Sequence, residues 1–305
     1  MAQAEKKISR RRFLKASTFV ATGAALTYGA VSVPLLRKKN KVLLRPPGAL
    51  DEDLFLASCI KCGQCLQVCP PQVIHLADID QGFGIGTPYI IPRRGGCILC
   101  SGLPCVLACP TGALNHHLSL GKDAEMGIAV VSSPSTCLAM LGKNDLLFRL
   151  EQLQQHPEKG DIVTELRDIV ARLAGRISPA EKTKLQERFS MPEISESTLP
   201  QLIAKVKLSD LDWLIAFVTG SSLAQSGCRV CLDECPIRDE KTIVFEPKSE
   251  TQEKGAFFPV VQTSCVGCGV CEEKCPTPVA SITISPQKKW PGKNKDHVGE
   301  GGQST

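Results

Sequence analysis

Apolar residues recur at helical spacing through the middle of the chain, from residue 142 to residue 226. Positions three and four apart share one face of a helix, so these stripes predict amphipathic helices. Ser178-Pro179-Ala180-Glu181 supplies a cap, a proline for the first helical position and a glutamate that completes a capping box. Ser209-Asp210-Leu211-Asp212 begins another helix, which we expect to end near Val218. The segment is predicted to be a bundle of four or five helices that bury one another's stripes, formed by Leu146, Leu147, Leu150, Leu153, Ile162, Val163, Leu166, Ile169, Val170 and Leu173.

Short β-prone segments lie on either side of this helical stretch. They are Ile128-Ala129-Val130-Val131, Thr242-Ile243-Val244-Phe245 and Ser281-Ile282-Thr283-Ile284. Enrichment in β-branched residues over about four positions is typical of short strands. Helices and short strands together indicate an α+β fold.

The N-terminus has the pattern of an export signal. Ser9-Arg10-Arg11-Arg12-Phe13-Leu14-Lys15 precedes twenty-one uncharged residues, 16–36, and a basic run follows them. The Arg10-Arg11 pair before an apolar stretch is typical of a twin-arginine signal, so we expect export by the twin-arginine translocase. Two fates of the leader stay open: Ala30-Val31-Ser32 is an acceptable cleavage site, and the apolar stretch is long enough to remain as a membrane anchor.

The net charge of +5 comes from this leader. Residues 1–48 hold eleven of the 36 Lys and Arg residues but only one of the 31 Asp and Glu residues, so the remaining 25 basic and 30 acidic residues leave the body mildly acidic. The body has no basic stripe with interleaved aromatic residues, and we expect no nucleic-acid partner.

Sixteen cysteines carry the chemistry, and all except Cys137 lie in short blocks. Two blocks have the spacing C-x2-C-x2-C-x3-C-P, in which three thiolates wrap one [4Fe–4S] cluster and the fourth ligates the neighbouring cluster. A third block has the variant C-x2-C-x4-C-x3-C-P, and the remaining block has only three cysteines. Because four ligands for each of four clusters need sixteen cysteines, Cys137 is expected to complete the incomplete block. The expected ligands are Cys59, Cys62, Cys65, Cys69, Cys97, Cys100, Cys105, Cys109, Cys137, Cys228, Cys231, Cys235, Cys265, Cys268, Cys271 and Cys275.

Other uses of these cysteines fit less well. A zinc ribbon needs two C-x2-C pairs and has no use for a third close cysteine or for the terminal Cys-Pro. Disulfides within such tight runs have unsuitable geometry, and no Cys-x-x-Cys-His for covalent haem occurs.

The sequence shows no catalytic site of its own. It has no Ser/His/Asp set, no phosphate-binding glycine loop and no paired acids placed for hydrolysis. His116-His117 could relay protons near a quinol site, but an exposed pair on a polar loop is the simpler interpretation. Whether the chain is formally part of an enzyme is left open, and electron transfer is the function that its cysteines indicate.

The motifs together resemble the MauM/NapG family of ferredoxin-type proteins. The resemblance rests on the leader, the four blocks in this order, and the segments Leu43-Leu44-Arg45-Pro46-Pro47-Gly48-Ala49-Leu50, Cys62-Gly63-Gln64-Cys65 and Gly86-Thr87-Pro88. It covers nearly everything except residues 142–226. It implies a periplasmic carrier of four [4Fe–4S] clusters that receives electrons from a polytopic membrane quinol dehydrogenase (NapH-like). The electrons would pass to a periplasmic c-type cytochrome or to a reductase such as nitrate reductase. The MauM branch is linked to methylamine oxidation, and the family's third block keeps its first cysteine close to the other three.

The expected organisation is two ferredoxin-like 2×[4Fe–4S] modules with an all-α insertion. We place the signal or anchor at residues 1–44, one module at 45–141, the helical insertion at 142–226, the second module at 227–288 and a flexible tail at 289–305. The blocks would pair in sequence order, one with two and three with four, although related sixteen-iron subunits pair one with four and two with three.

The predicted function is exported electron transfer. Two alternatives remain: the iron–sulfur subunit of a molybdenum oxidoreductase, and a maturation or assembly factor whose clusters are structural. Reversible redox behaviour of the clusters would separate a carrier from an assembly factor.

Overall fold

The computed structural model describes residues 17–23, 42–79, 84–157, 161–247 and 256–286. The chain divides into two units, one comprising residues 43–75 and 88–305 and the other residues 1–42 and 76–87. In the smaller unit, residues 17–23 are helical, and the Ala77 N–H donates to the Thr87 carbonyl at 2.9 Å. All sixteen cysteines belong to the larger unit.

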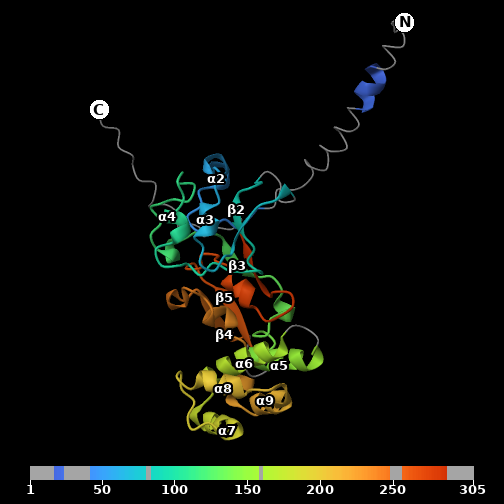
Figure 1. The fold of residues 1–305 in the computed structure, drawn as a ribbon, viewed down its shortest axis with the longest axis vertical. Coiled ribbons are helices and arrows are strands. Elements are labelled where there is room, and N and C mark those ends of the chain that lie inside the picture. Colours follow the sequence, from blue (N-terminus) through green and yellow to red (C-terminus); the bar gives the residue numbers. More distant parts are fainter. Residues whose placement is uncertain (1–16, 24–41, 80–83, 158–160, 248–255, 287–305) are drawn as a thin grey trace, which may run out of the picture. The chain divides into compact units, whose positions relative to one another are not determined.

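The first part of the larger unit holds three short helices, α2 (Glu52–Ser58), α3 (Gln64–Gln67) and α4 (Pro104–Leu107). Helix α3 packs against α4 (Figure 1). Gly63 precedes α3 with φ +75°, a conformation that glycine adopts without strain. Two short strands, β1 (Ile74–Leu76) and β2 (Pro88–Ile90), form one small sheet. The core here is built on the fully buried side chains of Phe55, Leu103, Val106 and Leu114.

The predicted strands are confirmed. Strand β3 (Ile128–Val131) pairs antiparallel with β6 (Ile282–Ser285), and β4 (Ile243–Pro247) pairs antiparallel with β5 (Phe257–Val261). Ile128 lies opposite Ser285 and Val131 opposite Ile282, so residues far apart in the chain share one ribbon. Beside these ribbons, helix α10 (Val230–Asp233) packs against α11 (Val270–Lys274).

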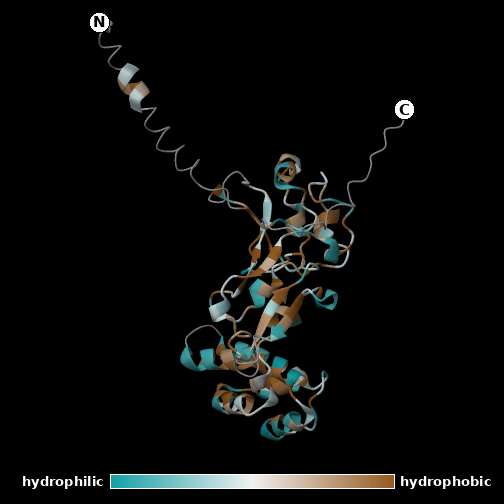
Figure 2. Ribbon diagram, turned by 180° about the vertical axis from the view of Figure 1, so that it is seen from behind, coloured by the Kyte–Doolittle hydropathy of each residue, from teal (hydrophilic) through white to brown (hydrophobic). Residues whose placement is uncertain are grey.

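The predicted helices are also confirmed. The five are α5 (Asp145–Gln155), α6 (Ile162–Arg176), α7 (Pro179–Phe189), α8 (Leu199–Lys205) and α9 (Leu211–Thr219). Their apolar faces turn inward, as the brown and teal sides of these helices show (Figure 2), and they enclose a core that includes Leu150, Leu166, Ile169, Leu185 and Leu214. The capping box of Ser178 and Glu181 is present at the start of α7. The remaining short elements are 3-10 helices: η2 (Gly121–Asp123), η3 (Pro134–Thr136), η4 (Leu208–Asp210), η5 (Ser222–Gln225) and η6 (Arg238–Glu240).

Two predictions fall on residues that the structure does not describe. Arg10 and Arg11 of the export signal lie outside the described residues, as does the expected tail at 289–305. In the part of the chain that is described, no helix combines the length and apolar character needed to cross a bilayer.

Candidate iron–sulfur sites

Cys59, Cys62 and Cys65 from the first block line a small cavity together with Cys109, the last cysteine of the second block. We call these four cysteines the first site. Apolar side chains of Phe55, Ala113 and Leu114 complete the wall. Cys62 is exposed, so this site reaches the surface of the protein.

Cys97, Cys100 and Cys105 line a second small cavity, and Cys69 from the first block joins them. These four cysteines form the second site. In each of these two blocks the fourth cysteine lies at the neighbouring site, Cys69 at the second and Cys109 at the first. The exchange is possible because α3 and α4 pack against each other. Pro70 follows Cys69 at the point where the chain leaves the site.

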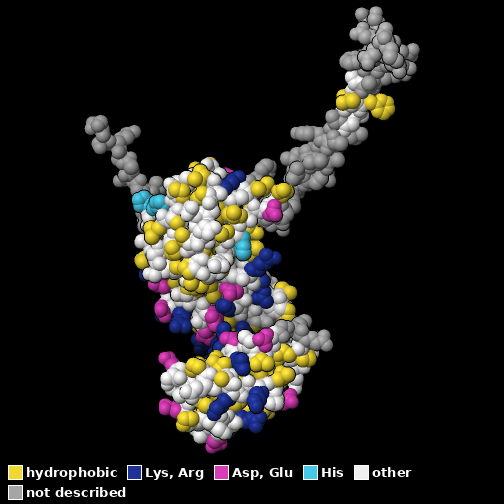
Figure 3. Space-filling view, in the orientation of Figure 1, with side chains coloured by type: hydrophobic (Ala, Val, Ile, Leu, Met, Phe, Trp, Pro, Cys, Tyr) yellow, Lys and Arg dark blue, Asp and Glu magenta, His cyan; other side chains and the backbone are white. Residues whose placement is uncertain are grey.

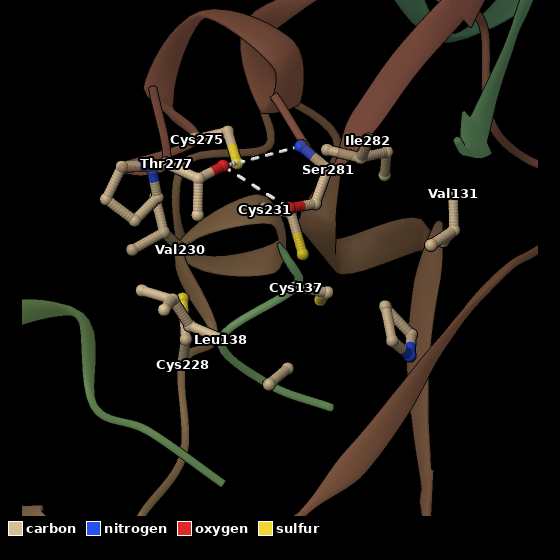
Figure 4. Close-up of a pocket in the computed structure, with 13 residues that line it drawn as sticks. Val131, Cys137, Leu138, Cys228, Val230, Cys231, Cys275, Thr277, Ser281 and Ile282 are labelled. Atoms are coloured by element: carbon tan, nitrogen blue, oxygen red, sulfur yellow. Dashed lines mark hydrogen bonds between the residues drawn. The ribbon is translucent and has the colours of Figure 1, made fainter. Parts of the chain in front are cut away.

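Cys137 lies with Cys228, Cys231 and Cys275 around a small cavity, the third site. Figure 4 shows the four sulfur atoms surrounding this space. The distant Cys137 is brought there by a buried cluster in which Leu138 and Ala139 pack with Cys228 and Val230. Two side-chain contacts close the loop, since Thr136 Oγ1 and Ser281 Oγ are 2.9 Å apart and the Asn144 amide donates to Ser226 Oγ at 3.1 Å.

The remaining cysteines, Cys235, Cys265, Cys268 and Cys271, form the fourth site. Cys271 is buried, and burial raises its pKa. The nearby thiols add to this effect in the order Cys268, Cys231, Cys265 and Cys235, of which Cys231 belongs to the neighbouring third site. Cys265 packs against Cys271 in a buried cluster that includes Ile243 and Ile282. The structure thus brings twelve of the predicted residues together in three sets of four, and the remaining four lie near one another.

Burial dominates the electrostatics of these thiols. It raises the pKa of Cys97 to about 11, and burial followed by Cys97 and Cys69 raises the pKa of Cys105 to about 12. Burial followed by Cys137 and Cys275 raises the pKa of Cys231 to about 12. Four thiolates crowded into an apolar cavity are costly unless a positively charged group binds them, so the donor set fits a metal-containing group.

The spread of these thiols fits a cluster better than a single ion. Within the described residues, no three Cys, His, Asp or Glu side chains approach closely enough to hold one metal ion. In a [4Fe–4S] cube each thiolate binds a different iron, so its ligands stand apart around the cube. The four residues around each site therefore fit such a cube.

Two of the crossing cysteines receive hydrogen bonds that the sequence analysis did not identify. Burial raises the pKa of Cys275, but the Thr277 hydroxyl at 3.1 Å and the Ser281 N–H at 3.4 Å outweigh it and lower the pKa overall. At Cys109 the Leu114 N–H and the backbone and hydroxyl of Thr111 likewise outweigh burial and lower the pKa. Both cysteines begin a Cys-Pro-Thr tripeptide. This repeated tripeptide is the sequence signal for the hydrogen bonds to the two sulfur atoms.

The histidine pair has the predicted exposure. His116 and His117 are both exposed, and His116 Nε2 lies 2.7 Å from the Cys109 carbonyl oxygen. His116 thus fixes the loop that follows the first site.

Comparison with known proteins agrees with this site chemistry. The family model described as a 4Fe-4S dicluster domain matches residues 58–139 and 226–279. A methylamine utilization ferredoxin-type protein MauM from Paracoccus denitrificans is 28% identical over 297 residues, covering 95% of this chain and 94% of the relative. The ferredoxin-type protein NapG of Escherichia coli is 27% identical over 299 residues, 96% and 93% of the two chains. NapG of Haemophilus influenzae is 40% identical over 149 residues, 46% and 52% of the two chains.

No solved structure matches the chain. The 4Fe-4S match spans all four cysteine blocks and Cys137. The chain is therefore an iron–sulfur protein homologous to the MauM and NapG ferredoxin-type proteins over about 95% of its length.

Proposed function

We propose that this chain is an exported electron-transfer protein that carries four [4Fe–4S] clusters in two ferredoxin-like modules. The observation that carries the proposal is that twelve of the sixteen cysteines surround three cavities in sets of four, while the other four lie near one another. The sixteen cysteines are the proposed ligands. A [4Fe–4S] cluster held in this way supplies one-electron redox chemistry.

The modules follow from the crossing cysteines. Cys69 and Cys109 exchange between the first two sites, and Cys235 and Cys275 exchange between the last two. Residues 45–141 and 227–288 are therefore proposed as the two modules, paired in sequence order, and residues 142–226 as an all-α insertion within the long connection from Cys137 to Cys228.

The protein's own residues hold the thiolates and adjust their environment. Phe55, Leu103 and Ile282 wall the sites with apolar surface and keep water from the sulfur atoms. The Ser281 and Leu114 N–H groups donate to sulfur and stabilise negative charge there. These hydrogen bonds raise the reduction potential of the group that the sulfur atoms hold.

The proposed setting is the periplasm, reached by the twin-arginine route, with association to the membrane if the leader is kept. The relatives named NapG support a role in the corresponding electron-transfer system. We propose that electrons come from a NapH-like quinol dehydrogenase and leave to a periplasmic cytochrome or reductase such as nitrate reductase.

A redox titration of the anaerobically purified protein tests this function. A carrier gives reversible EPR signals at potentials accessible to the quinone pool, and membranes containing the quinol dehydrogenase reduce it when quinol is added. Clusters that cannot be reduced and reoxidised without breakdown would contradict a carrier and indicate a structural role. Stoichiometric isolation with a large molybdenum subunit would contradict the NapH-like partnership.

A further inference from the structure

Arg93 joins the two halves of the cysteine-containing unit. Its Nη1 donates to the carbonyls of Glu272 at 2.8 Å and Cys275 at 2.9 Å. Its Nη2 donates to the carbonyls of Thr277 at 2.7 Å and Pro278 at 3.3 Å. These carbonyls belong to the end of α11 and the loop after it, so the guanidinium caps that helix from a distant part of the chain.

Backbone contacts beside Arg93 bring the second and fourth sites together. The Cys97 N–H donates to the Cys268 carbonyl at 2.8 Å, which joins a ligand of the second site to a ligand of the fourth. The preceding N–H, of Gly96, donates to Glu273 Oε2 at 2.7 Å. The two cysteine loops are thus hydrogen-bonded directly to each other.

Glycine makes this approach possible. A Cβ on Gly96 would lie 2.4 Å from the Val270 nitrogen, much closer than real Cβ atoms come. A Cβ on Gly267, whose φ is +72°, would lie 2.4 Å from the Gly127 carbonyl carbon. Any larger residue at either position would push the halves apart.

The sites therefore have a definite order. The first and second sites share crossing cysteines, as do the third and fourth. The backbone hydrogen bond from Cys97 to Cys268 joins the second site to the fourth. Burial agrees with the place of the first site at one end, since Cys62 is exposed while Cys97 and Cys105 of the second site are buried.

We propose that the four sites stand in one row in the order first, second, fourth, third, and that Arg93 is the positioning residue that holds the second site against the fourth. The inference rests on the proposed function in that each site must hold its cluster. The fourth site, which is built mainly from the last cysteine block, then lies inside the row. The third site, which contains Cys137, lies at one end. Arg93 also fixes the carbonyl of Cys275, a ligand of that end site.

The two ends of the row differ in their surroundings. Exposed apolar side chains of Leu54, Ile60 and Leu107 accompany the first site. The third site lies beside a cleft of mixed charge, in which Cys275 is accompanied by Arg149, Arg172, Lys274, Glu165, Asp168 and Glu273. On the face shown in Figure 3, charged side chains gather over the lower elements, while apolar and uncharged surface covers the region of α2, α3 and α4. Partners at the two ends thus meet different surface chemistry.

The experiment compares Arg93→Gln with Arg94→Gln in the full-length, anaerobically reconstituted protein. Arg94 is the neighbouring exposed arginine and serves as the matched control. We expect both variants to keep the iron content of the wild type. Arg93→Gln is expected to weaken magnetic coupling between the second and fourth clusters in EPR spectra of stepwise reduced protein, leaving the first–second and third–fourth couplings unchanged. Arg93→Lys should restore part of the coupling, since an ammonium group can still donate to these carbonyls.

A second measurement does not depend on the EPR signals and so remains informative if a variant incorporates less iron. Amide hydrogen exchange of the α11 region should increase by about tenfold or more in Arg93→Gln and not in Arg94→Gln, as expected when several hydrogen bonds to one helix end are lost. Gly96→Ala, which forces the junction apart without removing the arginine, should weaken the same coupling.

The outcomes separate this inference from the proposed function. Wild-type protein without four clusters would defeat the proposed function. Four clusters whose couplings and exchange are the same in Arg93→Gln and the wild type would overturn the role of Arg93. Coupling that places the fourth site at an end of the row would overturn the order.

Discussion

Replacing Cys137 with alanine tests the most unusual feature of the third site, a ligand far in the chain from its three partners. Cys137 lines the cavity with Cys228, Cys231 and Cys275. Its backbone neighbours Met140 and Ala139 direct their N–H groups at its sulfur, while burial raises its pKa. The side chain is therefore held in place for binding at this cavity.

The size of the effect follows from the ligand count. Four clusters hold about sixteen irons, and the third site accounts for about four of them. Cys137→Ala should reduce the iron content to about twelve, or to about fifteen if the three remaining thiolates keep a three-iron cluster. Cys137 does not line the first or second cavity, and the first, second and fourth sites should keep their EPR signals.

The assay is iron and acid-labile sulfide analysis of anaerobically purified protein, followed by EPR of the reduced sample. Leu141→Ala is the control, because this residue lies in the same loop, is 39% exposed and does not line the cavity. Cys137→Ser is a graded variant, since a serine oxygen can replace sulfur weakly. Full iron content with unchanged spectra in Cys137→Ala would refute the assignment of this ligand.

Three further changes test other parts of the structure. Leu166→Ala removes a fully buried side chain from the helical core and should destabilise the helices by about 2–5 kcal/mol, as measured by hydrogen exchange. The control is Glu165→Ala, and loss of iron in Leu166→Ala alone would contradict a separately packed insertion. Thr277→Val removes the hydroxyl 3.1 Å from the Cys275 sulfur and should lower one cluster potential by on the order of 20–60 mV in a redox titration, the equivalent of one hydrogen bond; an unchanged or higher potential would count against this bond. The N–H groups of Ser222 and Ser178 chiefly lower the pKa of Glu181 from its ordinary value of 4.5 to about 2. The ionised carboxylate therefore stabilises the fold fully above pH 4.5, and this stabilisation is lost as the pH falls towards 2. The difference in α7 exchange protection between the wild type and Glu181→Gln should therefore shrink from pH 5 to pH 2, and a constant difference would contradict this linkage.

Features that depend on local chemistry could be predicted from the sequence. The capping box at Ser178 and the helical stripes around Leu166 and Ile169 depend on residues a few positions apart, and the structure shows them as expected. The cysteine spacings are local in the same sense, since two-residue gaps turn three thiols towards one point. Cys137 was assigned by count alone, and the structure places it beside Cys228 through contacts that no spacing rule describes.

Long-range features could not be predicted in this way. The acceptors of Arg93 lie 179 to 185 positions further along the chain, and they are backbone carbonyls, which have no signature in the residue pattern. The close approach at Gly96 likewise depends on the Val270 backbone, so glycine there resembles any loop glycine until the fold is known. The order of the sites is decided by these contacts and not by the order of the blocks.

Iron and sulfide analysis of the purified wild-type protein, combined with an EPR-monitored redox titration, tests the central claim most directly. A carrier of four clusters should contain about sixteen irons and sixteen sulfides per chain, with signals that reduce and reoxidise reversibly. About twelve irons would mean that the third site holds no cluster, and zinc in place of iron would contradict the assignment of all four sites.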